Sequence, residues 1–223
     1  MGRALELTTT AADARWEETY ESLAYTAFAL GTHADDAQIQ PLLRQVRGIL
    51  VDWEAIEGDR RKARGAAIAT RAEVRVADAS LDHTLAELAA TVLRLADQRR
   101  DAPLYQRLFP EPHEAVIDLG LAGELPAAAV ALAQLEEGDD LPDEVRQHTE
   151  ALRRAVQVGN GALARRGEAY AALGRLQARV ESWHENAEST ARYIHKALIR
   201  LGESRGLSYR WTASFFVDGT PIV

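Results

Sequence analysis

The chain has 223 residues, with 26 basic against 34 acidic side chains and no cysteine. Without cysteine it has no disulfide framework, no Cys-ligated metal centre and no thiol nucleophile. The net charge of −8 disfavours general binding to nucleic acid or anionic lipid. The longest run without a charged residue, Ser22 to Ala34, has 13 residues, fewer than the roughly 18 that suggest a membrane span. The first residues lack the apolar core of a signal peptide, so we expect a cytoplasmic protein with no membrane partner.

The N-terminal region is predicted to begin with an arm or strand over residues 1–10 and to continue as a helix. Residues 4–10 alternate weakly between apolar and polar side chains, which is the period of a strand. From Ala11 to Leu30 large apolar residues recur three or four positions apart, which is the spacing of one helix face. The members of that face are Trp16, Tyr20, Leu23, Ala27 and Leu30. We expect this helix to pack against a longer one.

Two much longer helices are predicted, one in each half of the chain. Between residues 42 and 95 apolar or small residues follow at steps of three or four with one exception, and no proline lies between Pro41 and Pro103. A second stripe, at steps of three, four or seven, runs from Val145 to Leu201. Within it, Gly159-Asn160-Gly161 is prone to turn, and the sequence leaves open whether the helix breaks there.

Two helices of matched length joined by about 40 residues should lie antiparallel. With the connection centred near residue 121, position i faces roughly position 242 − i. This register brings Trp53 close to Trp183, which would form a wide aromatic layer. The expected long-helix bundle comprises residues 11–100 and 142–204. The intervening residues 101–141 hold four of the seven prolines, with Pro142 just beyond, so we expect short helices that form a small helical knob.

The C-terminal residues 205–223 are predicted to form a β-like tail. Residues 207–215 alternate between large and polar side chains, and Asp218-Gly219 offers a turn. Because a two-stranded ribbon is marginal in water, it must lie on its own helices or add to a partner chain, and both readings stay open. The side chains that we assign to this interaction tail are Tyr209, Trp211, Phe215, Phe216 and Val217.

Charge is sorted along the chain. Residues 58–75 carry six basic and two acidic side chains, residues 151–179 six and one, and residues 111–150 one and eleven. The antiparallel register places the two basic stretches side by side as a basic belt. Its members are Arg60, Arg61, Lys62, Arg64, Arg71, Arg75, Arg165, Arg166, Arg175 and Arg179. The belt is either a solvated face paired with scattered carboxylates, a contact for the acidic segment of another copy, or a nucleic-acid surface.

The sequence contains none of the nucleotide-loop, nucleophile-elbow or zinc-protease motifs that would mark a catalytic site. One Glu-x-x-His cluster stands out, and the register places two further carboxylates opposite it. Its members are Glu54, Glu57, Glu181, His184 and Glu188. The arrangement resembles one half of a ferritin-like di-iron site, in which each of two helices carries Glu-x-x-His, but here the motif occurs once. We therefore expect an exposed structural face and no metal cofactor.

The sequence thus predicts an all-α protein: an elongated antiparallel helical bundle with two very long helices, a small helical knob and a short terminal β ribbon. We expect a non-enzymatic structural or adaptor protein without cofactors that contacts itself or another protein. The alternatives are a metal-binding helical-bundle oxidoreductase that uses the Glu/His cluster, and nucleic-acid binding through the Arg belt. A membrane-engaging helical protein is a further option, although the Ala-rich residues 125–135 are too short to span.

Overall fold

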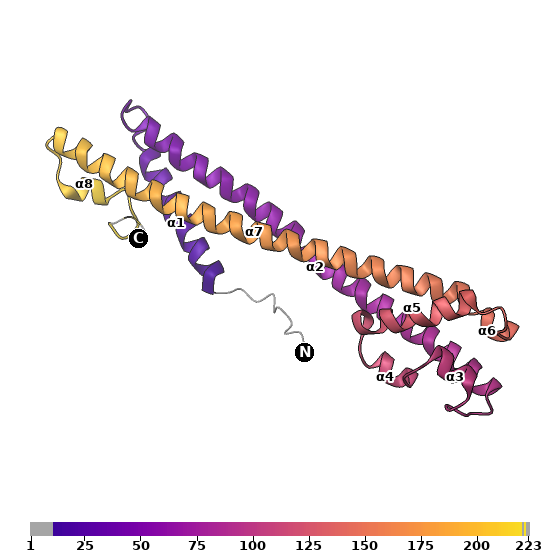
Figure 1. Cartoon of the computed structure of the whole chain (residues 1–223). Coiled ribbons are helices and arrows are strands. Elements are labelled where there is room, and N and C mark those ends of the chain that lie inside the picture. Colours follow the sequence, from indigo (N-terminus) through magenta and orange to yellow (C-terminus); the bar gives the residue numbers. More distant parts are fainter. Residues whose placement is uncertain (1–10, 220, 222–223) are drawn as a thin grey trace. The chain divides into compact units, whose positions relative to one another are not determined.

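The computed structural model describes residues 11–219 and residue 221 (Figure 1). The described chain is helical, and no β-strand occurs in it. The helices are α1 (Ala11–Gly31), α2 (Gln40–Leu95), α3 (Pro103–Leu108), α4 (His113–Ile117), α5 (Leu121–Glu137), α6 (Asp143–Arg146), α7 (Thr149–Ser204) and α8 (Tyr209–Ala213). Among these residues no helix is both long enough and apolar enough to cross a membrane.

The two long helices that the spacing predicts are α2 and α7, each of 56 residues. Helix α7 continues through Gly159-Asn160-Gly161 without a break. A Cβ atom added at Gly159 would lie 3.0 Å from methyl groups of Leu121 and Leu125 on α5. The glycine therefore marks a close approach of α5 to α7 and not a turn, which the sequence pattern did not distinguish.

The chain folds as two compact units, each of which is described by itself. Unit 1 comprises Met1–Lys62 and Gly174–Val223, and unit 2 comprises Ala63–Leu173. Helices α2 and α7 each contribute one segment to each unit.

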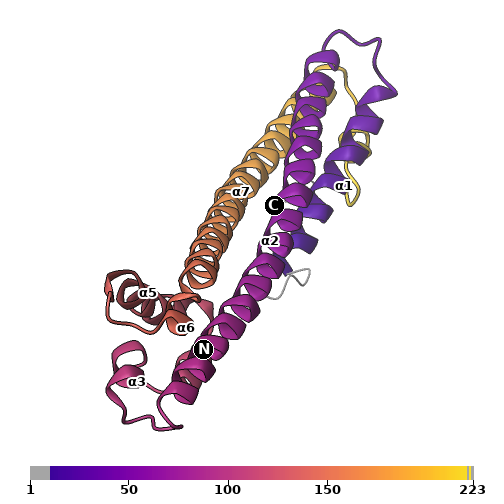
Figure 2. The same cartoon turned by 90° about the vertical axis from the view of Figure 1, so that its right-hand side faces the viewer.

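In unit 1, α1, the first part of α2 and the last part of α7 pack around a common apolar core (Figures 1 and 2). The rings of Trp53 and Trp183 lie 4.3 Å apart, and the indole N–H of Trp183 donates a 2.9 Å hydrogen bond to the Ile49 carbonyl. Further along, Arg179 donates to Asp59 at 2.8 Å, so the numbering descends on α7 as it ascends on α2. The predicted antiparallel pairing and the aromatic layer of Trp53 and Trp183 are confirmed here.

The prediction of a β ribbon is wrong for the C-terminal segment. Where we expected a strand over residues 207–215, the chain forms the short helix α8. A strand needs a neighbouring strand for its backbone N–H and C=O groups, and the described residues offer none, whereas a helical turn satisfies these groups locally. The Ser214 N–H, for example, donates to the Arg210 carbonyl. The strand predicted over residues 4–10 lies outside the described residues.

Helix α8 and the turn after it pack onto the core of unit 1. Phe215 and Phe216 are 1% and 2% exposed. A Cβ atom at Gly202 of α7 would lie 3.3 Å from the Trp211 ring, so the glycine lets α8 approach α7 closely. The Thr212 hydroxyl adds a hydrogen bond to the Leu198 carbonyl at 3.4 Å. The sequence left open whether the tail packs on its own helices or adds to a partner chain. In the structure its buried side chains pack on the helices of its own chain.

In unit 2, the second part of α2 and the first part of α7 also run antiparallel. Arg165 donates to Glu73 at 2.7 Å, and Thr91 and His148 share a hydrogen bond of 2.9 Å. Helices α3 to α6 pack beside this pair and build a second apolar core with it (Figure 2). The predicted short helices between the long ones are therefore present, and α5 is the longest of them at 17 residues.

Candidate functional site

The most unusual polar feature of unit 2 is a cluster of three carboxylates between α2 and α5. Asp78 and Asp82 lie four residues apart on α2, so both point from the same face of that helix. Glu124 lies in the first turn of α5, which begins after Gly120. One oxygen from each of the three side chains lies within 4.8 Å of the others. We call this group the carboxylate cluster.

The carboxylate cluster is buried, and four of its six oxygen atoms have no hydrogen-bond partner among the described residues. Glu124 is fully buried, at 0% exposure, and Asp78 and Asp82 are half-buried. Among the described residues, neither oxygen of Glu124 has a hydrogen-bond partner, and one oxygen each of Asp78 and Asp82 is likewise buried without one. Buried carboxylates are normally paired or hydrogen-bonded, because water no longer stabilises their charge. This cluster departs from that rule.

The electrostatics follow from the burial. Desolvation raises the pKa of Glu124 to about 8, and the neighbouring Asp82 and Asp78 carboxylates add to the rise. At neutral pH a proton therefore occupies Glu124 unless another positive charge takes its place. A strongly perturbed carboxyl beside two further carboxylates is a candidate functional site on physical grounds.

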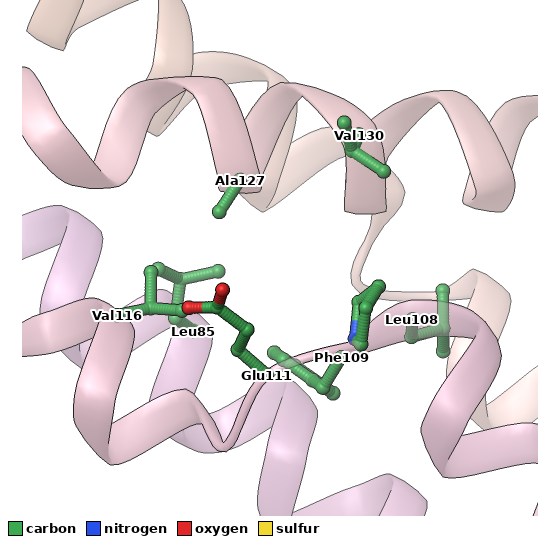
Figure 3. Close-up of a pocket in the computed structure, with 8 residues that line it drawn as sticks. Leu85, Leu108, Phe109, Glu111, Val116, Ala127 and Val130 are labelled. Atoms are coloured by element: carbon green, nitrogen blue, oxygen red, sulfur yellow. The ribbon is translucent and has the colours of Figure 1, made fainter.

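An apolar pocket of about 200 Å³ lies at the same helix interface (Figure 3). It begins at Leu85, less than one turn beyond Asp82 on α2, and at Ala127, less than one turn beyond Glu124 on α5. Its lining consists of Leu85, Leu108, Phe109, Pro110, Glu111, Val116, Ala127 and Val130. With one carboxylate in that lining, the pocket offers apolar contacts but no pair of groups for acid–base chemistry.

The predicted Glu/His cluster lies in unit 1, where two of its members, His184 and Glu188, lie together, and the expectation of an exposed face is wrong for His184. His184 is 7% exposed, and its Nδ1 lies 3.2 Å from the Thr19 hydroxyl. Burial lowers the pKa of His184, and the Arg15 guanidinium lowers it further. Glu188 lies 3.2 Å from His184 Nε2 and accepts a hydrogen bond from Arg15. His184 is therefore a buried core residue whose ring lies between Thr19 and Glu188.

The other three members of that predicted cluster are spread over the surface of unit 1. Glu57 accepts a hydrogen bond of 3.0 Å from Arg60, and Glu181 accepts one of 3.2 Å from Gln177. Glu54 is exposed. In the described part of the chain, the one group of three potential metal ligands close enough to share an ion is the carboxylate cluster of unit 2.

The basic belt is divided between the two units. In unit 1, Arg60 is nearly buried, pairs with Glu57 and lies 5.1 Å above the Trp16 ring and 5.9 Å above the Trp53 ring. Arg179 pairs with Asp59. The remaining members here are exposed: Arg61, Lys62 and Arg175. Arg60 thus serves the core of unit 1 as a cation–π partner, a role the charge pattern did not indicate.

In unit 2, Arg165 pairs with Glu73, and both side chains are about half exposed. Arg64 and Arg166 are half-buried, and Arg71 and Arg75 are exposed. Two basic side chains of the predicted belt, Arg165 and Arg179, therefore pair with carboxylates on the facing helix. This agrees with the first of the three readings of the belt, a solvated face paired with acids.

The interaction tail also separates into two groups. Phe215 and Phe216 are buried in unit 1, and Trp211 is half-buried against the same core. Tyr209 and Val217 are 57% and 55% exposed. Most of the apolar area of the tail is thus covered by its own chain, and two side chains face outward.

Sequence reasoning missed the carboxylate cluster. Its signal was present: Asp78 and Asp82 each follow directly after a stripe residue of α2, and Glu124 stands in an otherwise apolar segment of 11 residues, 121–131. Acidic residues at the edge of a core-facing stripe indicate carboxylates that are partly buried and need a neutralising partner.

No family model, curated protein or solved structure matches this chain.

Proposed function

We propose that this protein is a non-enzymatic adaptor that works through protein–protein contacts, and that its primary contact is with a second copy of itself. The observation that carries the proposal is an uncharged, aromatic face on α1. Residues 22–34 contain no charged side chain, yet Tyr25 and Phe28 on this segment are 44% and 78% exposed.

The two aromatic residues form one surface. They lie three positions apart on α1, so their side chains are neighbours on the helix. Single exposed apolar residues are common, but the centres of protein interfaces are depleted of charge and enriched in aromatic side chains. A solvent-facing helix segment with two aromatics and no charge has that composition.

The C-terminal segment extends this face. The Tyr25 hydroxyl donates to the Ser214 carbonyl at 3.4 Å, which places the end of the chain beside α1. Val217, three residues further on, is exposed. The tail would contribute to the partner contact through its exposed side, which borders the α1 face, while its buried aromatics hold it in place.

A second copy fits this face because the net charge of −8 opposes contacts between most of the surface of two copies. An uncharged patch on a two-fold axis meets its own equivalent without juxtaposing like charges. A fully buried aromatic side chain covers roughly 150–250 Å². Because Tyr25 and Phe28 are 44% and 78% exposed, together they can supply roughly a third of the roughly 800 Å² per partner of a standard interface. The C-terminal segment supplies further area.

Light scattering coupled to size exclusion tests the proposal. We expect the full chain, loaded between about 5 and 200 µM, to approach twice its 24.5 kDa mass. Phe28→Ser should remain monomeric. Val51→Ser is the matched control, since Val51 is 63% exposed on α2 but is followed by the charged Asp52. A wild-type monomer at the highest concentration, or a dimer that Phe28→Ser leaves intact, contradicts the proposal.

A further inference from the structure

We propose that Asp78, Asp82 and Glu124 in unit 2 form a binding site for one divalent cation that prefers oxygen ligands, of the Mg²⁺, Ca²⁺ or Mn²⁺ class. The proposal is independent of the dimer face, which lies in unit 1. Two observations carry it: the convergence of three carboxylates from two helices, and the complete burial of an unpartnered Glu124 that points into their midst.

The geometry suits a single ion. Ca²⁺ lies about 2.3–2.6 Å from its oxygen ligands, and Mg²⁺ about 2.0–2.1 Å, so ligands on opposite sides of one ion are about 4–5 Å apart. The carboxylate oxygens of the cluster lie within 4.8 Å of one another. Carboxylate oxygens without nitrogen or sulfur ligands select hard cations over zinc or copper. Three side chains leave coordination positions for water, as Mg²⁺ and Mn²⁺ sites commonly do.

The charge balance also suits an ion. No basic side chain among the described residues forms a salt bridge with Asp78, Asp82 or Glu124. Some carboxylates elsewhere in unit 2 do have such partners; Glu73 pairs with Arg165, and Glu136 pairs with Arg153. A divalent cation would neutralise two of the three carboxylate charges and satisfy the buried oxygen atoms at the same time.

The fold supplies what a site needs beyond its ligands. Asp78 and Asp82 are fixed by helix spacing on α2, and Glu124 is fixed by the start of α5. Gly120 precedes that start with φ of +69°, a conformation that favours glycine and sets the direction in which α5 leaves the turn. A bound cation would therefore link α5 to α2, and we expect it to stabilise unit 2.

Calorimetric titration of the full chain tests the site, after treatment with a chelator. MnCl₂, CaCl₂ and MgCl₂ are the probes, and Glu124→Gln is the central variant because the amide keeps the shape of the side chain but removes its charge. Asp82→Asn removes a second ligand charge from the other helix. Glu137→Gln, at the exposed end of the same helix α5, is the matched control.

We expect one cation per chain for at least one of the three salts, with at least a tenfold weaker affinity in Glu124→Gln and in Asp82→Asn and an unchanged affinity in Glu137→Gln. The unfolding temperature should rise with the cation in the wild type and in the control, but not in Glu124→Gln. Absence of saturable binding up to about 5 mM of each salt overturns the proposal. Binding of equal strength in the wild type and all three variants also overturns it, because the cations would then bind the acidic surface in general and not this cluster.

Discussion

Removing the charge of Glu124 should stabilise the protein at alkaline pH, although the side chain is completely buried. The pKa of Glu124 is raised from 4.5 to about 8, first by burial and then by Asp82 and Asp78. The folded state therefore holds a proton that the unfolded chain has already released. Between pH 4.5 and about 8 the free energy of unfolding falls as pH rises, because the folded state binds more protons than the unfolded state.

The magnitude follows from the size of the shift. Each pKa unit corresponds to about 1.4 kcal/mol, so a shift of this size costs about 5 kcal/mol of stability above pH 8. Glu124→Gln is neutral at every pH and avoids this cost. The raised pKa already includes the attraction of the carboxylate to the N-terminal backbone of α5, which lowers the pKa. We therefore expect a net gain of about 5 kcal/mol at pH 9 and little change at pH 5.

Urea unfolding in the presence of a chelator measures this difference, so that no bound cation masks the repulsion. Far-ultraviolet circular dichroism reports on both units, whereas tryptophan fluorescence reports on unit 1, which holds all four Trp residues of the chain. Glu137→Gln should follow the wild-type profile. If Glu124→Gln is destabilised by the same amount at pH 5 and pH 9, the reasoning from charge is wrong and the side chain contributes through its shape alone.

Four further substitutions test other parts of the structure. Gly65→Ala should stabilise by about 0.5–1 kcal/mol in thermal unfolding, because its Cβ meets nothing within 4 Å, whereas Gly159→Leu should destabilise by forcing α5 away from α7. Trp183→Phe should lower the stability seen by tryptophan fluorescence by about 1–3 kcal/mol, since it removes the indole hydrogen bond to the Ile49 carbonyl and reduces the buried ring area beside Trp53. Burial lowers the pKa of His184, so the unfolded chain binds more protons and stability should fall as pH drops below 6.5; His184→Gln should flatten that decline in acid-unfolding curves. A gain from Gly159→Leu, no loss from Trp183→Phe, or an unchanged acid limb would each contradict the packing described.

The long helices were predictable because their burial is periodic. A stripe with steps of three or four over more than 50 residues has no strand interpretation, and the pairing of two such stripes follows from their length. The contact of Trp53 with Trp183 could be placed in advance for the same reason. The α7 glycines were ambiguous, because close packing and a turn both favour a residue without a side chain.

The C-terminal helix was not predictable from its pattern. Trp211 and Phe215 lie four positions apart, and four is both an even number and about one helical turn. They therefore share a face in a strand and in a helix alike. What decides between the two is whether a neighbouring strand is present, and that is a property of the whole fold. The described residues provide none, so the helix forms.

The carboxylate cluster could be suspected but not located from the sequence. The spacing of Asp78 and Asp82 on one helix follows from their numbers, but nothing in the pattern places Glu124 beside them. The proximity of Glu124 to Asp78 and Asp82 depends on how α5 lies against α2 and α7. Because Gly159 has no side chain, α5 can approach α7 closely at this position. Periodicity describes one helix at a time, whereas a site assembled from two helices depends on their packing.

Salt should separate two modes of self-association, the contact of acidic with basic segments that the sequence suggested and the contact through α1 that we propose. A contact between the acidic residues 111–150 of one copy and the basic side chains of another is electrostatic, and its range shrinks from about 10 Å at 0.1 M salt to about 3 Å at 1 M. A contact through Tyr25 and Phe28 buries uncharged surface, and salt also screens the repulsion between two chains of net charge −8. The dimer fraction measured by light scattering should therefore hold or increase between 0.05 and 1 M sodium chloride, about the range over which surface ion pairs are lost. A dimer that dissociates over this range, and that Phe28→Ser does not affect, would assign the contact to the charged segments and not to α1.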